Sequence, residues 1–264
     1  MAFVRINGVL LHYRLSGKPG GPALALANSL GTDLRIWDAV VERLAPHYHV
    51  LSYDKRGHGL SDAPRAEYQL DDHLDDLAGL LDHVGWGRTA LAGVSIGGLI
   101  AQGMVLRAPG RIAALVLCDT APRVGDAAMW NGRIAAVLSG GTAAIADAVM
   151  ERWFSPAFRH ERADELAGWR NLFLRSDAVG YASTCATLRD TDLTEAIGAI
   201  EAPTLVVAGE HDGATPVEMV RAGAARIPGA RFTVLPGAGH IPSIEQPAAL
   251  ATLIDGFLKE VGGA

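Results

Sequence analysis

Ser95 is the residue around which a chemical function can be built. It stands between an apolar strand-like run, residues 88–94, and an apolar, alanine-rich helical run, residues 96–106, with a glycine two positions to either side. A serine at such a joint has a strained backbone, and side chains at the two glycine positions would clash. Its hydroxyl is then exposed at the end of a sheet, beside the N–H groups and the dipole of the helix. A glycine-rich turn with an incidental serine is the alternative, but the flanking strand and helix favour a nucleophile.

A serine hydroxyl becomes a nucleophile when a base removes its proton and an acid fixes the tautomer of that base. Two residues that directly follow predicted strands suit these roles. Asp212 ends the segment GEHD after residues 204–208, and His240 ends the segment GAGH after residues 232–235. Each is an ordinary loop residue when taken alone. Their joint appearance after Ser95, each just past a strand, is the specific signal. We therefore predict a catalytic triad of Ser95, Asp212 and His240.

Two other residues could fill the roles of acid and base. Asp119 also ends a predicted strand, residues 112–118, and some hydrolases take their acid from that earlier position. We prefer Asp212 because it follows the next strand with a loop glycine before it, and we interpret Asp119 as a cap at the start of the following segment. His58 lies in the tight polar loop RGHG, and we interpret it as part of a structural hydrogen-bond network.

Attack of such a serine on a carbonyl forms a tetrahedral oxyanion, which needs two hydrogen-bond donors. One is the backbone N–H of Ile96, the residue after the nucleophile. The other should come from the loop after the predicted strand 22–27. We predict the N–H of Leu30, because the small residues Ser29 and Gly31 allow it to turn inward. An ordinary loop between strand and helix is the alternative.

Alternating strand and helix patterns position these residues. After a hairpin over residues 4–13, the predicted strands are residues 22–27, 48–53, 88–94, 112–118, 204–208 and 232–235, and the predicted helices are residues 34–44, 70–84, 96–106, 217–227 and 247–261. This alternation predicts an α/β fold with a mostly parallel central sheet flanked by helices. It stops at residues 123–189, which are helical in character. We predict that they form a helical cap, inserted into a core of residues 1–122 and 190–264.

Composition and charge exclude several classes of protein. The 264 residues are 49% hydrophobic and 20% charged, as in a globular protein, and the net charge of −6 argues against nucleic acids and membrane surfaces as partners. Cys118 and Cys185 lie in apolar stretches, as expected of buried thiols in a reducing compartment. The chain shows neither a secretory signal nor an apolar stretch of the roughly 20 residues that span a bilayer. The sequence predicts a cytoplasmic protein and leaves its oligomeric state open, a homo-oligomer included.

The order of the segments resembles the α/β-hydrolase fold over essentially the whole chain, including the serine–acid–histidine order and the turn DKRGHGLS at residues 54–61. Four segments are similar to the 3-oxoadipate enol-lactonases of bacterial aromatic catabolism: NSLGTDLRIWD (28–38), LCDTAP (117–122), MWNGRI (129–134) and CATLRDTDL (185–193). The oxyanion loop departs from most relatives, which carry His-Gly where this chain has Asn28-Ser29. The resemblance implies hydrolysis of 3-oxoadipate enol-lactone to 3-oxoadipate in the β-ketoadipate pathway, with no metal or organic cofactor.

The substrate that this resemblance implies is a small lactone with a carboxylate, which a mostly apolar pocket must pair with a donor. The predicted cap supplies Trp130, with its indole N–H, and Arg133 three residues later on the same helical face. A packing tryptophan and a solvated arginine are the plainer interpretations. Arg189 is a further candidate.

Other mechanisms and functions stay open at this point. His240 could deprotonate Ser95 or activate water directly, and the sequence does not separate the two routes. Another carboxylester hydrolase, or a cofactor-free perhydrolase, would use the same triad without any need to bind a carboxylate. A small-molecule receptor of this fold is disfavoured because the triad is intact.

Overall fold

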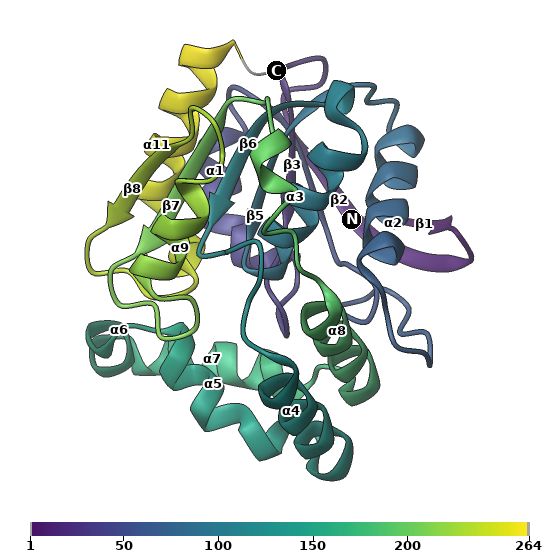
Figure 1. The fold of residues 1–264 in the computed structure, drawn as a ribbon, viewed down its shortest axis with the longest axis vertical. Coiled ribbons are helices and arrows are strands. Elements are labelled where there is room, and N and C mark those ends of the chain that lie inside the picture. The colour runs from purple at the N-terminus through teal and green to yellow at the C-terminus, as the bar shows by residue number, and fades with distance from the viewer. Residues whose placement is uncertain (1, 263–264) are drawn as a thin grey trace.

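The computed structural model describes residues 2–262, which form an eight-stranded sheet with helices on both sides (Figure 1). The strand order is β1-β2-β4-β3-β5-β6-β7-β8. The strands are β1 (Ala2–Ile6), β2 (Val9–Gly17), β3 (Ala23–Ala27), β4 (His49–Tyr53), β5 (Thr89–Val94), β6 (Ile112–Cys118), β7 (Thr204–Gly209) and β8 (Arg231–Leu235). The pairs β1–β2 and β2–β4 are antiparallel, and all later neighbours are parallel. The predicted α/β fold with a mostly parallel sheet is confirmed.

The helices outside the insertion follow the predicted positions closely. They are α1 (Asp38–Leu44), α2 (Leu70–His83), α3 (Ile96–Arg107), α9 (Val217–Ala224) and α11 (Pro247–Val261). The short α10 (Pro242–Glu245), directly before α11, was not predicted. Helix α3 packs on β5 and β6, α2 packs on α3, and α1 packs on α11. Short 3₁₀ turns occur at η2 (Pro109–Arg111) and η4 (Ile197–Ala199).

One predicted helix is divided. Residues 34–44 begin as a 3₁₀ turn, η1 (Leu34–Trp37), and only α1 is α-helical. The first N–H groups of the turn are bound by two carboxylates, since Asp33 accepts from the N–H of Arg35 and Asp54 accepts from the N–H of Leu34. Asp54 comes from the end of β4, so this long-range contact fixes the tighter first turn.

Residues between β6 and β7 form a separate group of helices in the lower part of Figure 1. They are α4 (Ala127–Gly140), η3 (Thr142–Ile145), α5 (Ala146–Trp153), α6 (Pro156–Glu161), α7 (Ala163–Leu174) and α8 (Ala178–Asp190). The first and last of these, α4 and α8, pack along each other. We refer to α4–α8 as the cap. Residues 1, 263 and 264 of the predicted core lie outside the described residues.

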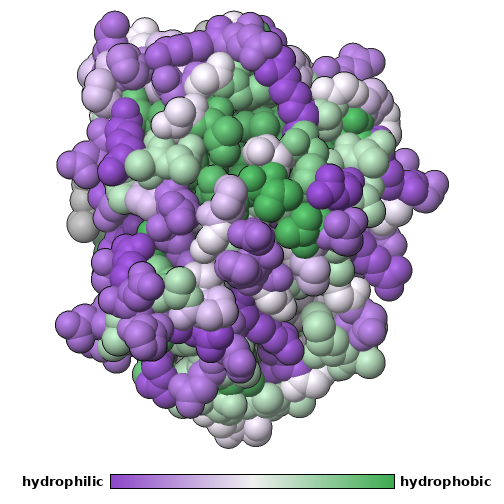
Figure 2. All heavy atoms as spheres, turned by 90° about the vertical axis from the view of Figure 1, so that its left-hand side faces the viewer, coloured by the Kyte–Doolittle hydropathy of each residue, from purple (hydrophilic) through white to green (hydrophobic). Residues whose placement is uncertain are grey.

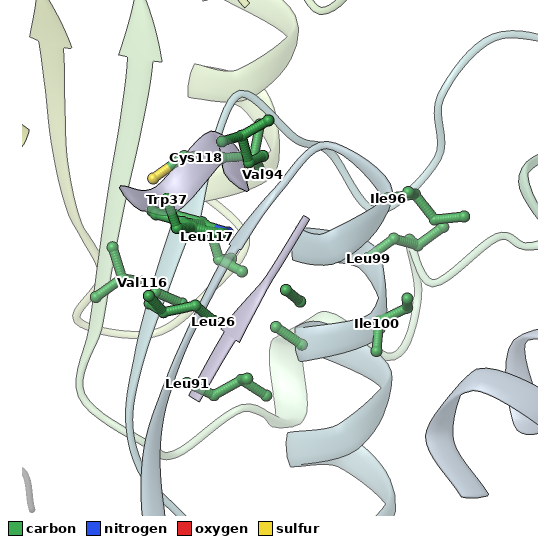
Figure 3. Packing of buried hydrophobic residues seen from close by; sticks show 14 of the residues in the cluster. Leu26, Trp37, Leu91, Val94, Ile96, Leu99, Ile100, Val116, Leu117 and Cys118 are labelled. Atoms are coloured by element: carbon green, nitrogen blue, oxygen red, sulfur yellow. The ribbon is translucent and has the colours of Figure 1, made fainter. Parts of the chain in front are cut away.

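The core lies where β3, β5 and β6 meet α3 and η1. Every residue of β5 and β6 is buried, as predicted for central parallel strands. Figure 3 shows Val94 and Cys118 at the ends of these strands, and Ile96 and Leu99 on α3. The nucleophile position between Val94 and Ile96 is therefore held by packed apolar neighbours on both sides.

The surface near β8, the last strand of the sheet, combines apolar and polar areas. Figure 2 shows apolar residues gathered in the upper half of this side, above a more hydrophilic lower half. Among residues 2–262, no helix has the length and apolar character needed to cross a membrane. Cys118 and Cys185 are both free and buried, as predicted, and burial raises the pKa of the Cys185 thiol to about 12.

Candidate active site

Ser95 lies in a strained turn between β5 and α3. Its backbone angles are φ 58° and ψ −121°, in the region that non-glycine residues rarely adopt. A Cβ at Gly93 would lie 2.2 Å from the carbonyl oxygen of Gly97, and a Cβ at Gly97 would lie 2.3 Å from the carbonyl oxygen of Ala27. Both glycines are therefore required by close backbone contacts, which is the physical cause of the G-x-S-x-G spacing.

Gly97→Ala is expected to destabilise the protein by about 1–3 kcal/mol, because the new methyl group meets backbone that cannot move aside cheaply. Thermal unfolding followed by circular dichroism measures the change. Gly132→Ala is the matched control, because a Cβ at this exposed helical position meets nothing within 4 Å. It should leave the melting temperature unchanged or slightly raised. A Gly97→Ala variant that melts like the wild type would contradict the packing described for the turn.

His240 and Asp212 come together at the ends of β8 and β7. Nδ1 of His240 lies 2.8 Å from Oδ2 of Asp212, and both side chains are almost fully buried. Asp212 also accepts hydrogen bonds from the N–H groups of Ala214 and Thr215 and from the Thr215 hydroxyl. Burial alone would raise the pKa of Asp212, but His240 and these donors lower it below its ordinary value. An ionised Asp212 holds the proton of His240 on Nδ1 and leaves Nε2 as the basic nitrogen.

Asp119 does not cap the start of the insertion, and that interpretation is wrong. The residue has φ 48°, and its carboxyl is turned toward β7, where Oδ1 accepts from the N–H of Gly209 at 2.6 Å. Burial, and then the neighbouring Asp212, raise the pKa of Asp119 well above its ordinary value. Its other oxygen, Oδ2, is buried and has no hydrogen-bond partner among residues 2–262. Asp119 thus binds the end of β7, while Asp212 contacts the histidine.

His58 supports the oxyanion loop rather than acting as a base. Its Nε2 accepts from the N–H of Gly31 at 2.9 Å, and its Nδ1 donates to the carbonyl oxygen of Arg56 at 3.2 Å. Burial lowers the pKa of His58 well below its ordinary value, so the ring is neutral. Both ring nitrogens are occupied, in agreement with the structural interpretation.

The N–H groups of Leu30 and Ile96 have the properties expected of oxyanion donors. Within residues 2–262, neither group donates to a protein acceptor. Ile96 is the first residue of α3, so its N–H points along the positive end of the helix dipole. Leu30 lines the same cavity as Ser95 and His240. The two N–H groups remain our prediction for the oxyanion hole.

The cavity around Ser95 is small, about 50 Å³, and is lined by residues of both the core and the cap. Its lining residues are Ser29, Leu30, Ser95, Val124, Met129, Trp130, Arg133, Arg152, Trp153, Tyr181, Leu188, Ala214, Thr215 and His240. A larger cavity, of about 370 Å³, is lined by other residues, from the loop after β3 and the end of α7. The predicted nucleophile, base and cap residues therefore share one site.

Trp130 and Arg133 both line this cavity, but the indole N–H of Trp130 is already bound. It donates to the carbonyl oxygen of Val124 at 2.6 Å, and its role as a donor to a substrate carboxylate stays a prediction that requires this bond to be exchanged. The guanidinium of Arg133 lies over the Trp130 ring, with its Cζ 5.1 Å from the ring centroid. Trp130 therefore orients Arg133 by a cation–π contact.

Comparison with known proteins agrees with this geometry. Residues 19–247 match the family of the alpha/beta hydrolase fold. The chain belongs to this family. Its triad candidates occupy the loops from which α/β hydrolases take their catalytic groups.

Three similar proteins are hydrolases of esters or lactones. The 3-oxoadipate enol-lactonase 2 of Acinetobacter baylyi is 33% identical over 251 residues, covering 95% of this chain and 94% of that protein. The enol-lactonase of Burkholderia xenovorans LB400 is 37% identical with a TM-score of 0.95, over 98% of this chain and 100% of that one. A thermophilic esterase from Thermogutta terrifontis, solved with malate bound, is 29% identical with a TM-score of 0.94, over 99% of each chain. The resemblance seen in the sequence is confirmed.

Three residues of the hydrolase site were not found from the sequence. Arg152, an exposed residue of α5, and Tyr181, a buried residue of α8, both line the cavity. Glu245 accepts from the N–H of Gly239, next to the histidine, and from the hydroxyl of Ser155 in the cap. No local pattern marks these residues, because each contacts a segment distant in the chain.

Arg189, the further candidate, is engaged elsewhere. Its guanidinium forms ion pairs with Glu67 and Asp190, with N–O distances of 2.9 and 2.7 Å. Both pairs raise its pKa above the ordinary value. Arg189 joins the cap to the core and is not among the residues of the cavity.

Proposed function

We propose that this hydrolase opens 3-oxoadipate enol-lactone to 3-oxoadipate, a step in the breakdown of aromatic compounds. The observation that carries the proposal is that Arg133 and Arg152 share one cavity with Ser95 and His240. Within residues 2–262, no carboxylate forms an ion pair with either arginine. A nucleophile beside guanidinium groups that lack a protein counter-charge suits a lactone that carries a carboxylate. The similar enol-lactonases support this choice of substrate.

The residues of the site can perform the reaction in two stages. His240 Nε2 takes the proton of Ser95 as Oγ attacks the lactone carbonyl, and the N–H groups of Leu30 and Ile96 bind the oxyanion. Ring opening expels an enol oxygen, which becomes a ketone and is a better leaving group than an alkoxide. The imidazolium gives its proton to the departing enol oxygen. Neutral His240 then takes a proton from the water that attacks the acyl-enzyme and returns it to Ser95 Oγ as the acid leaves. Asp212 stabilises the imidazolium in both stages.

The substrate class is tested by comparing the enol-lactone with the methyl ester of its side-chain carboxylate. The two compounds have the same reactive ring and differ in the charge. We expect kcat/KM to be at least about 10-fold higher for the acid, since a charge-assisted hydrogen bond contributes about 1.5–3 kcal/mol. Equal values for the two compounds would favour a different carboxylester hydrolase with no need for the carboxylate.

Arg133→Ala is expected to lower kcat/KM for the enol-lactone by roughly 10–150-fold, the loss of one charge-assisted hydrogen bond. The same variant should hydrolyse the methyl ester nearly as well as the wild type, because that compound has no charge to bind. Steady-state assays of both substrates measure the difference.

Arg189→Ala is the matched control for this prediction. It removes a cap arginine whose ion pairs lie outside the cavity, so the preference for the acid should be unchanged. Equal losses on both substrates in Arg133→Ala would show that Arg133 is structural, and Arg152 would be the next residue to test.

A further inference from the structure

Lys55 is a buried lysine that no ion pair explains. It follows Asp54 at the end of β4 and is 1% exposed. Its Nζ donates to the carbonyl oxygens of Ser29, at 2.6 Å, and Asn28, at 3.4 Å. Within residues 2–262, no carboxylate lies within ion-pair distance of it. Burial of an ammonium group without a paired anion is costly, so its position calls for a reason beyond packing.

The contact with Ser29 places Lys55 one peptide group away from the oxyanion. The carbonyl of Ser29 and the N–H of Leu30 belong to the same planar peptide group. A donor on the carbonyl oxygen draws electron density from the amide and makes its N–H a stronger donor. Thr32 Oγ1 donates to the same oxygen at 2.8 Å. The peptide group is therefore both fixed in orientation and polarised toward the cavity.

The second oxyanion peptide is held in the same way. The carbonyl of Ser95 and the N–H of Ile96 form one peptide group, and its oxygen accepts from Thr120 Oγ1 at 2.7 Å. Thr120 is 3% exposed. A Cβ at Gly98 would lie 2.5 Å from its Cγ2, so the threonine is closely packed against α3. Each oxyanion donor thus has a buried side chain on the opposite end of its peptide group.

We propose that Lys55 and Thr120 are positioning residues of the oxyanion hole. Each holds the carbonyl of a peptide group whose N–H binds the oxyanion, and the ammonium form of Lys55 adds a positive charge on the far side of one of these peptide groups. This inference rests on the proposed function, in which Ser95 attacks a carbonyl and Leu30 and Ile96 supply the donors.

The surroundings of Lys55 leave its hydrogen bond intact in either protonation state. Burial lowers the pKa of Lys55 to about 7, although the Asp54 and Asp33 carboxylates act to raise it. His58 and His73 are also near, and burial lowers the pKa of both well below the ordinary value, so they are neutral. The ammonium form therefore predominates below pH 7, and the amine that remains above pH 7 still donates to Ser29.

A trifluoromethyl ketone distinguishes positioning of the oxyanion from general support of the loop. Ser95 Oγ bonds to the carbonyl carbon of 1,1,1-trifluoropentan-2-one, the carbonyl electron pair moves to its oxygen, and the serine proton passes to His240. The product is an anionic hemiketal with its oxygen in the oxyanion hole. Pentan-2-one has nearly the same shape and stays a neutral ketone. Both compounds are measured as competitive inhibitors of nitrophenyl acetate hydrolysis.

Lys55→Met should raise the inhibition constant of the trifluoroketone roughly 10- to 100-fold, somewhat less than removal of a direct oxyanion donor. Thr120→Val, which keeps the shape of the side chain, should raise it by a smaller factor. Thr32→Val is the matched control, because it removes a neutral donor from the same Ser29 oxygen, and its effect should be smaller than that of Lys55→Met. The inhibition constant of pentan-2-one should change less than about 2-fold in all three.

Two results would overturn the inference. One is an unchanged affinity for the trifluoroketone in a folded Lys55→Met variant, and the other is an equal loss for both ketones, which would indicate collapse of the loop. If Lys55→Met does not fold, Thr120→Val decides by the same two criteria. A wild-type protein that binds the trifluoroketone at Ser95, but does not open the enol-lactone, would contradict the proposed function without affecting this inference.

Discussion

Ser95→Ala is expected to abolish hydrolysis of esters and lactones while the protein remains folded. Loss of a triad member typically lowers kcat on the order of 10⁴- to 10⁶-fold. The hydroxyl lies at the edge of a small cavity, and the contacts that hold the turn come from the backbone of Gly93 and Gly97. Removing Oγ therefore takes away the nucleophile without changing the packing. Steady-state kinetics and circular dichroism of the purified variant measure the two properties.

Ser139→Ala serves as the control, because Ser139 lies on the exposed surface of α4 and bonds within its own helix. This variant should keep full activity. If Ser95→Ala kept more than a few per cent of the wild-type rate, the serine route would be wrong. Direct activation of water by His240 would then become the favoured mechanism.

Asp212→Asn is expected to lower kcat by roughly 10⁴-fold, because the amide favours the wrong tautomer of the histidine. The Asp212 carboxylate only accepts hydrogen bonds, from Ala214, Thr215 and His240. An amide presents an N–H₂ group to one of these donors, and the proton of His240 then moves away from Nδ1. Nε2 no longer acts as the base.

Asp119→Asn is the matched control for the acid. Burial and the neighbouring Asp212 raise the pKa of the Asp119 carboxyl well above its ordinary value, and an uncharged amide keeps the acceptor that binds the N–H of Gly209. We expect a loss of less than about 10-fold, as for an exchange that preserves a neutral hydrogen bond. The reverse ranking of the two variants, at the same folded fraction, would move the catalytic acid to the end of β6.

The fold could be predicted from the sequence wherever a local pattern has one structural solution. The strand Ile112–Cys118 and the helix Pro247–Val261 have the predicted bounds, because their apolar patterns and flanking residues are unambiguous. The spacing of Gly93 and Gly97 around Ser95 also has one explanation, the close approach of backbone on both sides. Long-range contacts account for the failures, as at η1, where Asp54 binds the first turn.

Side-chain directions were harder to predict than positions. The sequence places Asp119 at the end of a strand, but a positive φ turns its carboxyl toward β7 rather than toward the cap. It places Trp130 on the cap helix, but the backbone of Val124 binds the indole N–H. No sequence pattern marked Arg152 as a cavity residue, since its place in the lining depends on how α5 lies over the core. Such directions follow from tertiary packing, which no local spacing encodes.

The most direct measurement is the opening of 3-oxoadipate enol-lactone by the purified wild-type protein. Loss of the enol absorbance is followed together with the amount of 3-oxoadipate formed. We expect stoichiometric conversion, with a kcat/KM above that for the methyl ester of the same lactone. Hydrolysis of nitrophenyl acetate without any opening of the enol-lactone would contradict the proposed function.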